Sequence, residues 1–137
     1  MKIVPWMLAA VLAVALAPVA AQAALSEDQF TMKTTGDLIA LCTADPKDPL
    51  YTAAVNYCHG FATGAYSAEQ AHEAATKAKP LFCLPDPRPT RAQAVADFVA
   101  WTKEDPARLD LPPVHGMFTF LMQRYPCPGS ARGKPHS

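Results

Sequence analysis

The stretch 51–70, YTAAVNYCHGFATGAYSAEQ, most constrains how this chain can fold. Its apolar residues recur at i, i+3, i+4 and i+7, the spacing of one face of an α-helix. The sequence therefore predicts an amphipathic helix that runs on to about Ala75, ends before Pro80, and has the rest of the chain packed around it. The residues of its apolar face are Tyr51, Ala54, Val55, Cys58, Phe61, Ala62, Ala65 and Tyr66.

Two glycines, Gly60 and Gly64, lie on the opposite side of this helix. A glycine inside a helix costs about 1 kcal/mol relative to alanine. A neighbour that fits closely against the missing side chains would compensate for this cost. We therefore expect Gly60 and Gly64 to form a close-packing face, against another helix of the chain or against the second subunit of a homodimer. Exposed glycines that are simply tolerated are the alternative.

The N-terminal residues have the pattern of a cleavable signal peptide. Lys2 precedes an apolar run, and Ala21-Gln22-Ala23 offers an A-x-A cleavage site before Ala24. We therefore expect residues 1–23 to be removed on export, and the mature protein to lie in the periplasm without a membrane anchor. One domain then spans residues 24–128, and residues 129–137 form a disordered basic tail.

The chain contains four cysteines, which in a small exported domain indicate two disulfides. Sequence alone permits three pairings. We favour Cys42 with Cys58 and Cys83 with Cys127, because neither loop then encloses the other. No metal site and no cofactor are expected, since the cysteine spacings are wide and no C-x-x-C motif occurs.

Three further helices are expected, separated by proline-rich segments. Thr34 with Asp37 forms a capping box for a short helix that reaches Cys42, and Thr90 with Gln93 forms one for the helix after residues 81–89. The last helix carries an apolar face from Val114 to Tyr125, and residues 108–113 form a connector before it. Residues 81–89, LFCLPDPRP, contain three prolines and are predicted to be a stiff extended connector. The expected fold class is all-α, a compact bundle of about four helices with two disulfides and proline-rich connectors.

The sequence offers little for catalysis or for nucleic-acid binding. His59 adjoins Cys58, but a disulfide-bonded cysteine cannot act as a nucleophile. No G-x-S-x-G, H-E-x-x-H or glycine-rich phosphate loop occurs. The formal net charge is +0, and there is no basic stripe with interleaved aromatic residues of the kind that binds nucleic acid. We therefore expect no catalytic residues and a protein that is not an enzyme.

Short motifs run through the whole expected domain. They are Gly36-Asp37-Leu38 with Leu41-Cys42, Cys58-His59-Gly60-Phe61-Ala62-Thr63-Gly64, Phe82-Cys83-Leu84-Pro85, Leu109-Asp110-Leu111-Pro112 and Tyr125-Pro126-Cys127-Pro128. In their order, their spacing and all four cysteines, these motifs resemble the Rap/Tai family of type VI secretion immunity proteins. The resemblance implies a small helical periplasmic protein, often a dimer, that plugs the substrate groove of a papain-like cell-wall amidase injected by neighbouring bacteria.

Such an inhibitor needs a rigid protrusion rather than catalytic groups. The stiff segment from Asp86 to Arg91 and the end of the third helix are the candidate protrusions. Trp101 lies off the centre of the apolar face of that helix, so part of its indole is expected to face water; the alternative is that it closes the edge of the core. Tryptophan and arginine are enriched among binding hot spots. The expected partner-binding residues are Asp86, Arg88, Arg91, Trp101 and Lys103.

Two other hypotheses belong to different functional classes. A periplasmic stress chaperone, similar to the small disulfide-bonded Hde-type acid chaperones, would loosen at low pH and expose apolar surface. The carboxylates and the near-neutral charge of the chain allow this hypothesis without favouring it. An enzyme or redox protein would retain free thiols in its native state, whereas two structural disulfides would leave none.

Overall fold

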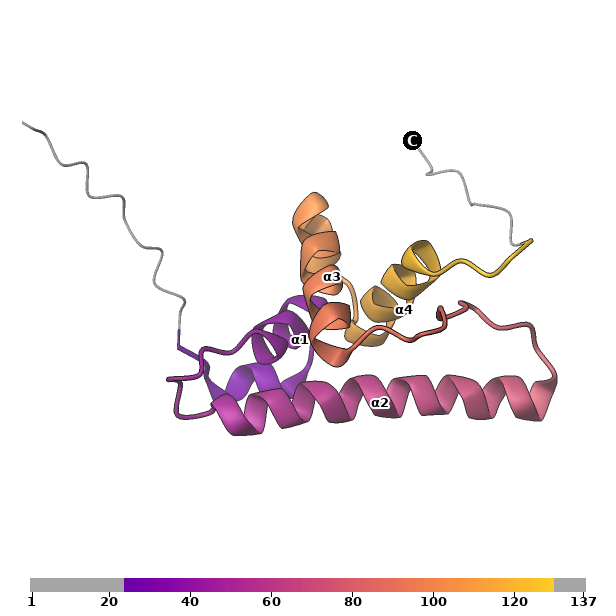
Figure 1. Cartoon of the computed structure of the whole chain (residues 1–137). Helices are drawn as coiled ribbons and strands as arrows, with labels where there is room; N and C mark the ends of the chain where they lie inside the picture. The colour runs from indigo at the N-terminus through magenta and orange to yellow at the C-terminus, as the bar shows by residue number, and fades with distance from the viewer. Residues whose placement is uncertain (1–23, 130–137) are drawn as a thin grey trace, which may run out of the picture.

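The computed structural model describes residues 24–129, and within them it is all-helical (Figure 1). The all-α prediction with four α-helices is confirmed, and no strand occurs within the described range. The expected signal peptide, residues 1–23, and the tail from residue 130 onward lie outside that range. In chain order the elements are η1 (Glu27–Thr31), α1 (Thr35–Cys42), α2 (Tyr51–Thr76), α3 (Arg91–Glu104), η2 (Pro106–Asp110) and α4 (Pro113–Arg124).

The long helix α2 forms one side of the molecule, and the other helices lie along its opposite side (Figure 1). Ala54 and Cys58 are buried, and the remaining residues of the predicted apolar face are half-buried. The second half of α2 extends past the other helices, and the chain then runs back beside it toward α3 (Figure 1). None of the described helices is both long enough and apolar enough to cross a membrane.

Gly60 and Gly64 are exposed on the uncovered side of α2. A Cβ atom added to either glycine would have no other atom within 4 Å. The prediction that another helix of this chain packs against them is therefore wrong: α2 is covered along one face only, and that face suffices to hold it. Contact with a second subunit remains a prediction.

The core consists of two adjoining groups of side chains. The first joins α1, α3 and α4, and the second attaches α1 to α2 through Leu41, Ala54 and Cys58. The rings of Phe98 and Phe120 meet with their centroids 5.2 Å apart. The first group comprises Leu38, Phe98, Trp101, Met117 and Phe120.

Gly116 is the point of closest approach between α1 and α4. A Cβ atom at this position would lie 2.1 Å from the hydroxyl oxygen of Thr35, which is far inside van der Waals contact. Thr35 is fully buried, and both its backbone N–H (2.7 Å) and its hydroxyl (2.9 Å) donate to the carbonyl oxygen of Leu111. The two helices therefore meet through a glycine that leaves room for a hydrogen-bonded threonine.

Both predicted capping boxes are present. At α1 the Thr34 hydroxyl accepts from the N–H of Asp37 (3.2 Å), whose carboxylate accepts from the N–H of Thr34 (2.9 Å). At α3 the Thr90 hydroxyl accepts from the N–H of Gln93 (3.2 Å), and the Gln93 amide oxygen accepts from the N–H of Thr90 (2.9 Å). The residues that precede each helix therefore satisfy backbone N–H groups that would otherwise lack partners.

Two short 3₁₀ helices were not expected from the sequence. The first of them, η1, lies before α1 and begins with a capping box between Ser26 and Gln29. The connector before α4 overlaps η2, where the Asp105 side chain accepts from the N–H of Ala107 (3.1 Å) and Pro106 occupies the first turn. Both segments are too short to show the apolar spacing of a helix, so that spacing could not predict them.

The favoured disulfide pairing is confirmed. Cys42 and Cys58 are bonded with their Cα atoms 5.2 Å apart, and Cys83 and Cys127 are bonded with their Cα atoms 4.8 Å apart. No cysteine of the described chain is left as a free thiol. One bridge ties α1 to α2, and the other ties the connector to the chain just after α4.

Candidate partner-binding face

The connector between α2 and α3 is fixed to the body of the protein near its beginning and at its end. Besides the bridge to Cys127, the N–H of Cys83 donates to the carbonyl oxygen of Tyr125 (2.8 Å). The buried Phe82 ring lies between the rings of Tyr66 and Phe118, at centroid distances of 6.0 and 6.1 Å. The Thr90 capping box joins the other end to α3. The connector is therefore held in one path between α2 and α3, where it helps to line an apolar cleft described below.

Two of the expected partner-binding residues, Arg88 and Arg91, lie at this end of α3. Arg88 is exposed on the connector, and its guanidinium lies 5.8 Å from the ring centroid of Tyr66. Arg91 is the first residue of α3 and is also exposed. Both line the mouth of the same cleft. The structure thus places the positive charges of Arg88 and Arg91 on the lining of one cleft.

The other exposed candidates lie further apart. Lys103 is near the opposite end of α3, about 18 Å from Arg91 at a rise of about 1.5 Å per residue. Arg91 and Lys103 both border a shallow groove between α3 and the segment that joins α1 to α2. Asp86 is exposed on the connector and does not line the cleft. The face therefore carries a positive charge near each end of α3.

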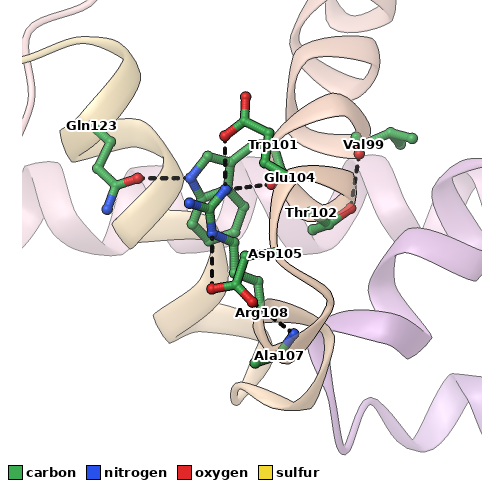
Figure 2. Close-up of polar contacts among 8 residues, drawn as sticks. All are labelled: Val99, Trp101, Thr102, Glu104, Asp105, Ala107, Arg108 and Gln123. Carbon is green, nitrogen blue, oxygen red and sulfur yellow. Dashed lines mark hydrogen bonds and ion pairs between the residues drawn. The ribbon is translucent and has the colours of Figure 1, made fainter. Parts of the chain in front are cut away.

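Trp101 points into the core rather than onto this face. It is 7% exposed, so the expectation that part of its indole faces water is wrong. Figure 2 shows its surroundings: the indole N–H donates to the Gln123 amide oxygen of α4 (2.7 Å). The Arg108 guanidinium lies 4.3 Å from its ring centroid, and the Phe98 ring stacks on it at 5.9 Å. α4 and the turn into η2 cover the edge of α3 that was expected to face water. Contact between Trp101 and a partner stays a prediction.

Arg108 is held over the indole by polar contacts to the end of α3 (Figure 2). Its guanidinium donates to the backbone carbonyl of Trp101 and to the carboxylate of Glu104 (3.0 Å). A second, longer ion pair joins it to Asp105 (3.9 Å). This cluster locks the turn between α3 and η2, so its role is structural.

An apolar cleft lies between the connector and the four α-helices. Its volume is about 220 Å³. It is assembled from residues far apart in the chain, so no local pattern could reveal it. His59 lies at its rim, and within residues 24–129 no three His, Cys, Asp or Glu side chains gather closely enough to hold a metal ion. The apolar residues that line the cleft and are also buried include Leu38, Phe98, Met117 and Phe120.

Comparison with known proteins identifies the family to which this fold and face belong. Neither the search of curated proteins nor that of solved structures finds a match. The family model described as Rap1a immunity proteins matches residues 34–127, which is more than half of the chain and includes all four α-helices and both disulfides. The chain therefore belongs to the family of Rap1a immunity proteins.

Proposed function

We propose that this immunity protein acts in the periplasm, where it binds and blocks a peptidoglycan amidase effector of a type VI secretion system. Family membership makes it a type VI secretion immunity protein in general terms, so it works on a protein partner. The observation that carries the proposal is that the family match covers the complete disulfide-bonded helical domain. Two disulfides in so small a domain are in keeping with an oxidising compartment such as the periplasm.

The proposed mechanism is steric: the protein covers the groove of the amidase and supplies no catalytic group. The connector and α3 form the proposed contact face, through the exposed side chains of Asp86, Arg88, Arg91 and Lys103. A contact element that is already rigid loses little conformational entropy on binding. The Cys83–Cys127 bridge and the connector prolines provide that rigidity.

A homodimer is part of the proposal. The uncovered side of α2 offers an open strip at Gly60 and Gly64 against which a second copy could pack closely. Light scattering at micromolar protein concentration measures this directly. A monomeric mass would exclude the homodimer without affecting the proposed inhibition.

Affinity capture followed by an activity assay tests the proposed function. The oxidised protein, residues 24–137, is immobilised, an extract of the source bacterium is passed over it, and the retained proteins are identified. We expect a cell-wall amidase whose hydrolysis of peptidoglycan falls in proportion to the amount of immunity protein added. The same chain with both disulfides reduced is the control for folded-state binding.

Two results would contradict the proposal. A retained amidase that stays fully active in the complex would exclude inhibition, and retention of no amidase would exclude this partner class. Retention of assorted unfolded proteins, mainly at low pH, would instead favour the acid-chaperone hypothesis.

A further inference from the structure

The apolar cleft is large enough to admit a side chain from outside. Its volume of about 220 Å³ exceeds that of an engineered cavity of about 150 Å³ that binds benzene. The ring of Phe82 and the side chain of Leu84 form the wall on the connector side. Ala62 of α2 and Ala94 of α3 are small, half-buried residues that leave the space between the two helices open. The cleft can therefore accommodate an aromatic ring or a branched aliphatic side chain.

The charges at the mouth of the cleft are all of one sign. They belong to Arg88 and Arg91, and no Asp or Glu lines the cleft. The ion pairs within residues 24–129 use Arg108 and Arg124, so neither Arg88 nor Arg91 has a carboxylate within 4.0 Å. A guanidinium presents a fork of N–H donors that matches a carboxylate, and it is less strongly hydrated than an ammonium. The mouth is therefore complementary to an anionic group beside the apolar one.

Both arginines are attached to backbone that is already ordered. Arg88 follows a segment bonded to Tyr125 and Cys127, and Arg91 begins a capped helix. The ring of Tyr66 supports the guanidinium of Arg88 from below the connector. A preformed pocket with a fixed charged rim is the arrangement in which a single inserted anchor contributes most to affinity.

We propose that the cleft receives an anchor from the effector: an apolar side chain, aromatic or branched aliphatic, with a carboxylate next to it on the effector surface. This inference rests on the proposed function and adds to it the direction of the contact. The effector inserts a side chain into the immunity protein, while the connector and α3 cover the effector around that point. The carboxylate lies between Arg88 and Arg91, and the apolar side chain lies above Phe98 and Phe120.

Affinity measurements on the captured amidase test this placement. Two variants perturb different parts of the cleft: Arg88→Gln/Arg91→Gln removes the charged rim, and Ala94→Phe fills the space between α2 and α3. The matched controls are Lys33→Gln/Lys47→Gln, which removes two exposed positive charges outside this cleft, and Ala71→Phe on the exposed side of α2. Calorimetry gives the dissociation constant of each variant, and urea denaturation shows that each is folded.

We expect Ala94→Phe to weaken binding by about 30-fold, the effect typical of a hot-spot contact. The double arginine variant should weaken binding by about tenfold and flatten its salt dependence, since it removes charges that attract the effector. Both controls should stay within about twofold of the unsubstituted protein.

Other outcomes distinguish a failure of the docking inference from a failure of the proposed function. If the amidase binds the unsubstituted protein and both cleft variants equally well, the docking inference is overturned and the proposed function stands. If no amidase binds the unsubstituted protein, both are overturned. If the cleft variants instead change the mass of the free protein measured by light scattering, the occupant is a second copy of this chain, and the inference is again overturned. The arginine variant alters only exposed side chains, so it decides the question even if Ala94→Phe fails to fold.

Discussion

Substitution of Gly116 by alanine tests the packing of α1 against α4 more sharply than any change in the apolar core. The new methyl group would lie 2.1 Å from Thr35 Oγ1, 3.0 Å from its Cγ2 and 3.1 Å from its Cβ. Rotation of the threonine side chain cannot relieve all three contacts, because the Cβ atom stays in place. The helices must therefore separate, or the Thr35 hydroxyl must leave the carbonyl oxygen of Leu111.

The expected loss of stability follows from three contributions. Overpacking of a tightly packed site costs about 1–3 kcal/mol. Loss of the Thr35 hydroxyl hydrogen bond adds about 1 kcal/mol. Alanine is better than glycine in a helix by about 1 kcal/mol, which offsets part of this loss. The net destabilisation is about 2 kcal/mol.

Urea denaturation followed by far-UV circular dichroism measures this change, with the disulfides intact. Gly60→Ala is the matched control, because its Cβ atom meets nothing, and it should raise the free energy of unfolding by up to about 1 kcal/mol. In a Thr35→Ala background the penalty of Gly116→Ala should fall, since two of the three close contacts are removed. A Gly116→Ala protein as stable as the original, or an unchanged penalty in that background, would refute the reasoning.

Three further changes have expected outcomes that the same denaturation assay can measure. Replacement of Cys83 and Cys127 by serine should lower the free energy of unfolding by about 4 kcal/mol in the chain-entropy model, and a loss below about 1 kcal/mol would contradict it. Thr90→Ala should cost about 1 kcal/mol, because α3 loses its N-cap, and Thr90→Ser should restore most of the stability. Gln123→Leu should cost about 1–3 kcal/mol and shift the tryptophan fluorescence, because the indole N–H of Trp101 loses its acceptor; an unchanged emission spectrum would count against this role.

The sequence predicted the features that depend on neighbouring residues. The capping boxes at Thr34 and Thr90 each need only a partner three residues away, so their hydrogen bonds form wherever the helix begins. The apolar face of α2 followed from its period for the same reason. The disulfide pairing was also correct, since each bridge joins segments that the helical layout brings together.

The features that failed depend on how the helices are arranged. The exposure of Trp101 was misjudged because two elements outside its own helix cover it in the folded chain. α4 is distant in the sequence, and Arg108 lies just beyond the end of α3. The alternative in which another helix of this chain packs against Gly60 and Gly64 was wrong, because the other helices all pack against the opposite face of α2; contact with a second subunit stays a prediction. Partner binding by Asp86, Arg88, Arg91 and Lys103 stays a prediction. The cleft that Arg88 and Arg91 line could not be predicted, because it required all of the surrounding helices to be placed.

The two disulfides also determine which backbone cuts can divide the molecule. They close two separate covalent rings, residues 42–58 and residues 83–127, which are joined only through residues 59–82. A protease that cuts once inside either ring leaves a single molecule, whereas one cut in the joining segment separates α1 from α3 and α4. Residues 59–76 of that segment belong to α2, whose far end extends beyond the other helices (Figure 1). Residues 77–81 of the segment are exposed and non-helical, so a protease can reach them without unwinding α2. The covalent integrity of the protein in the presence of proteases therefore depends on this short stretch more than on the helix before it.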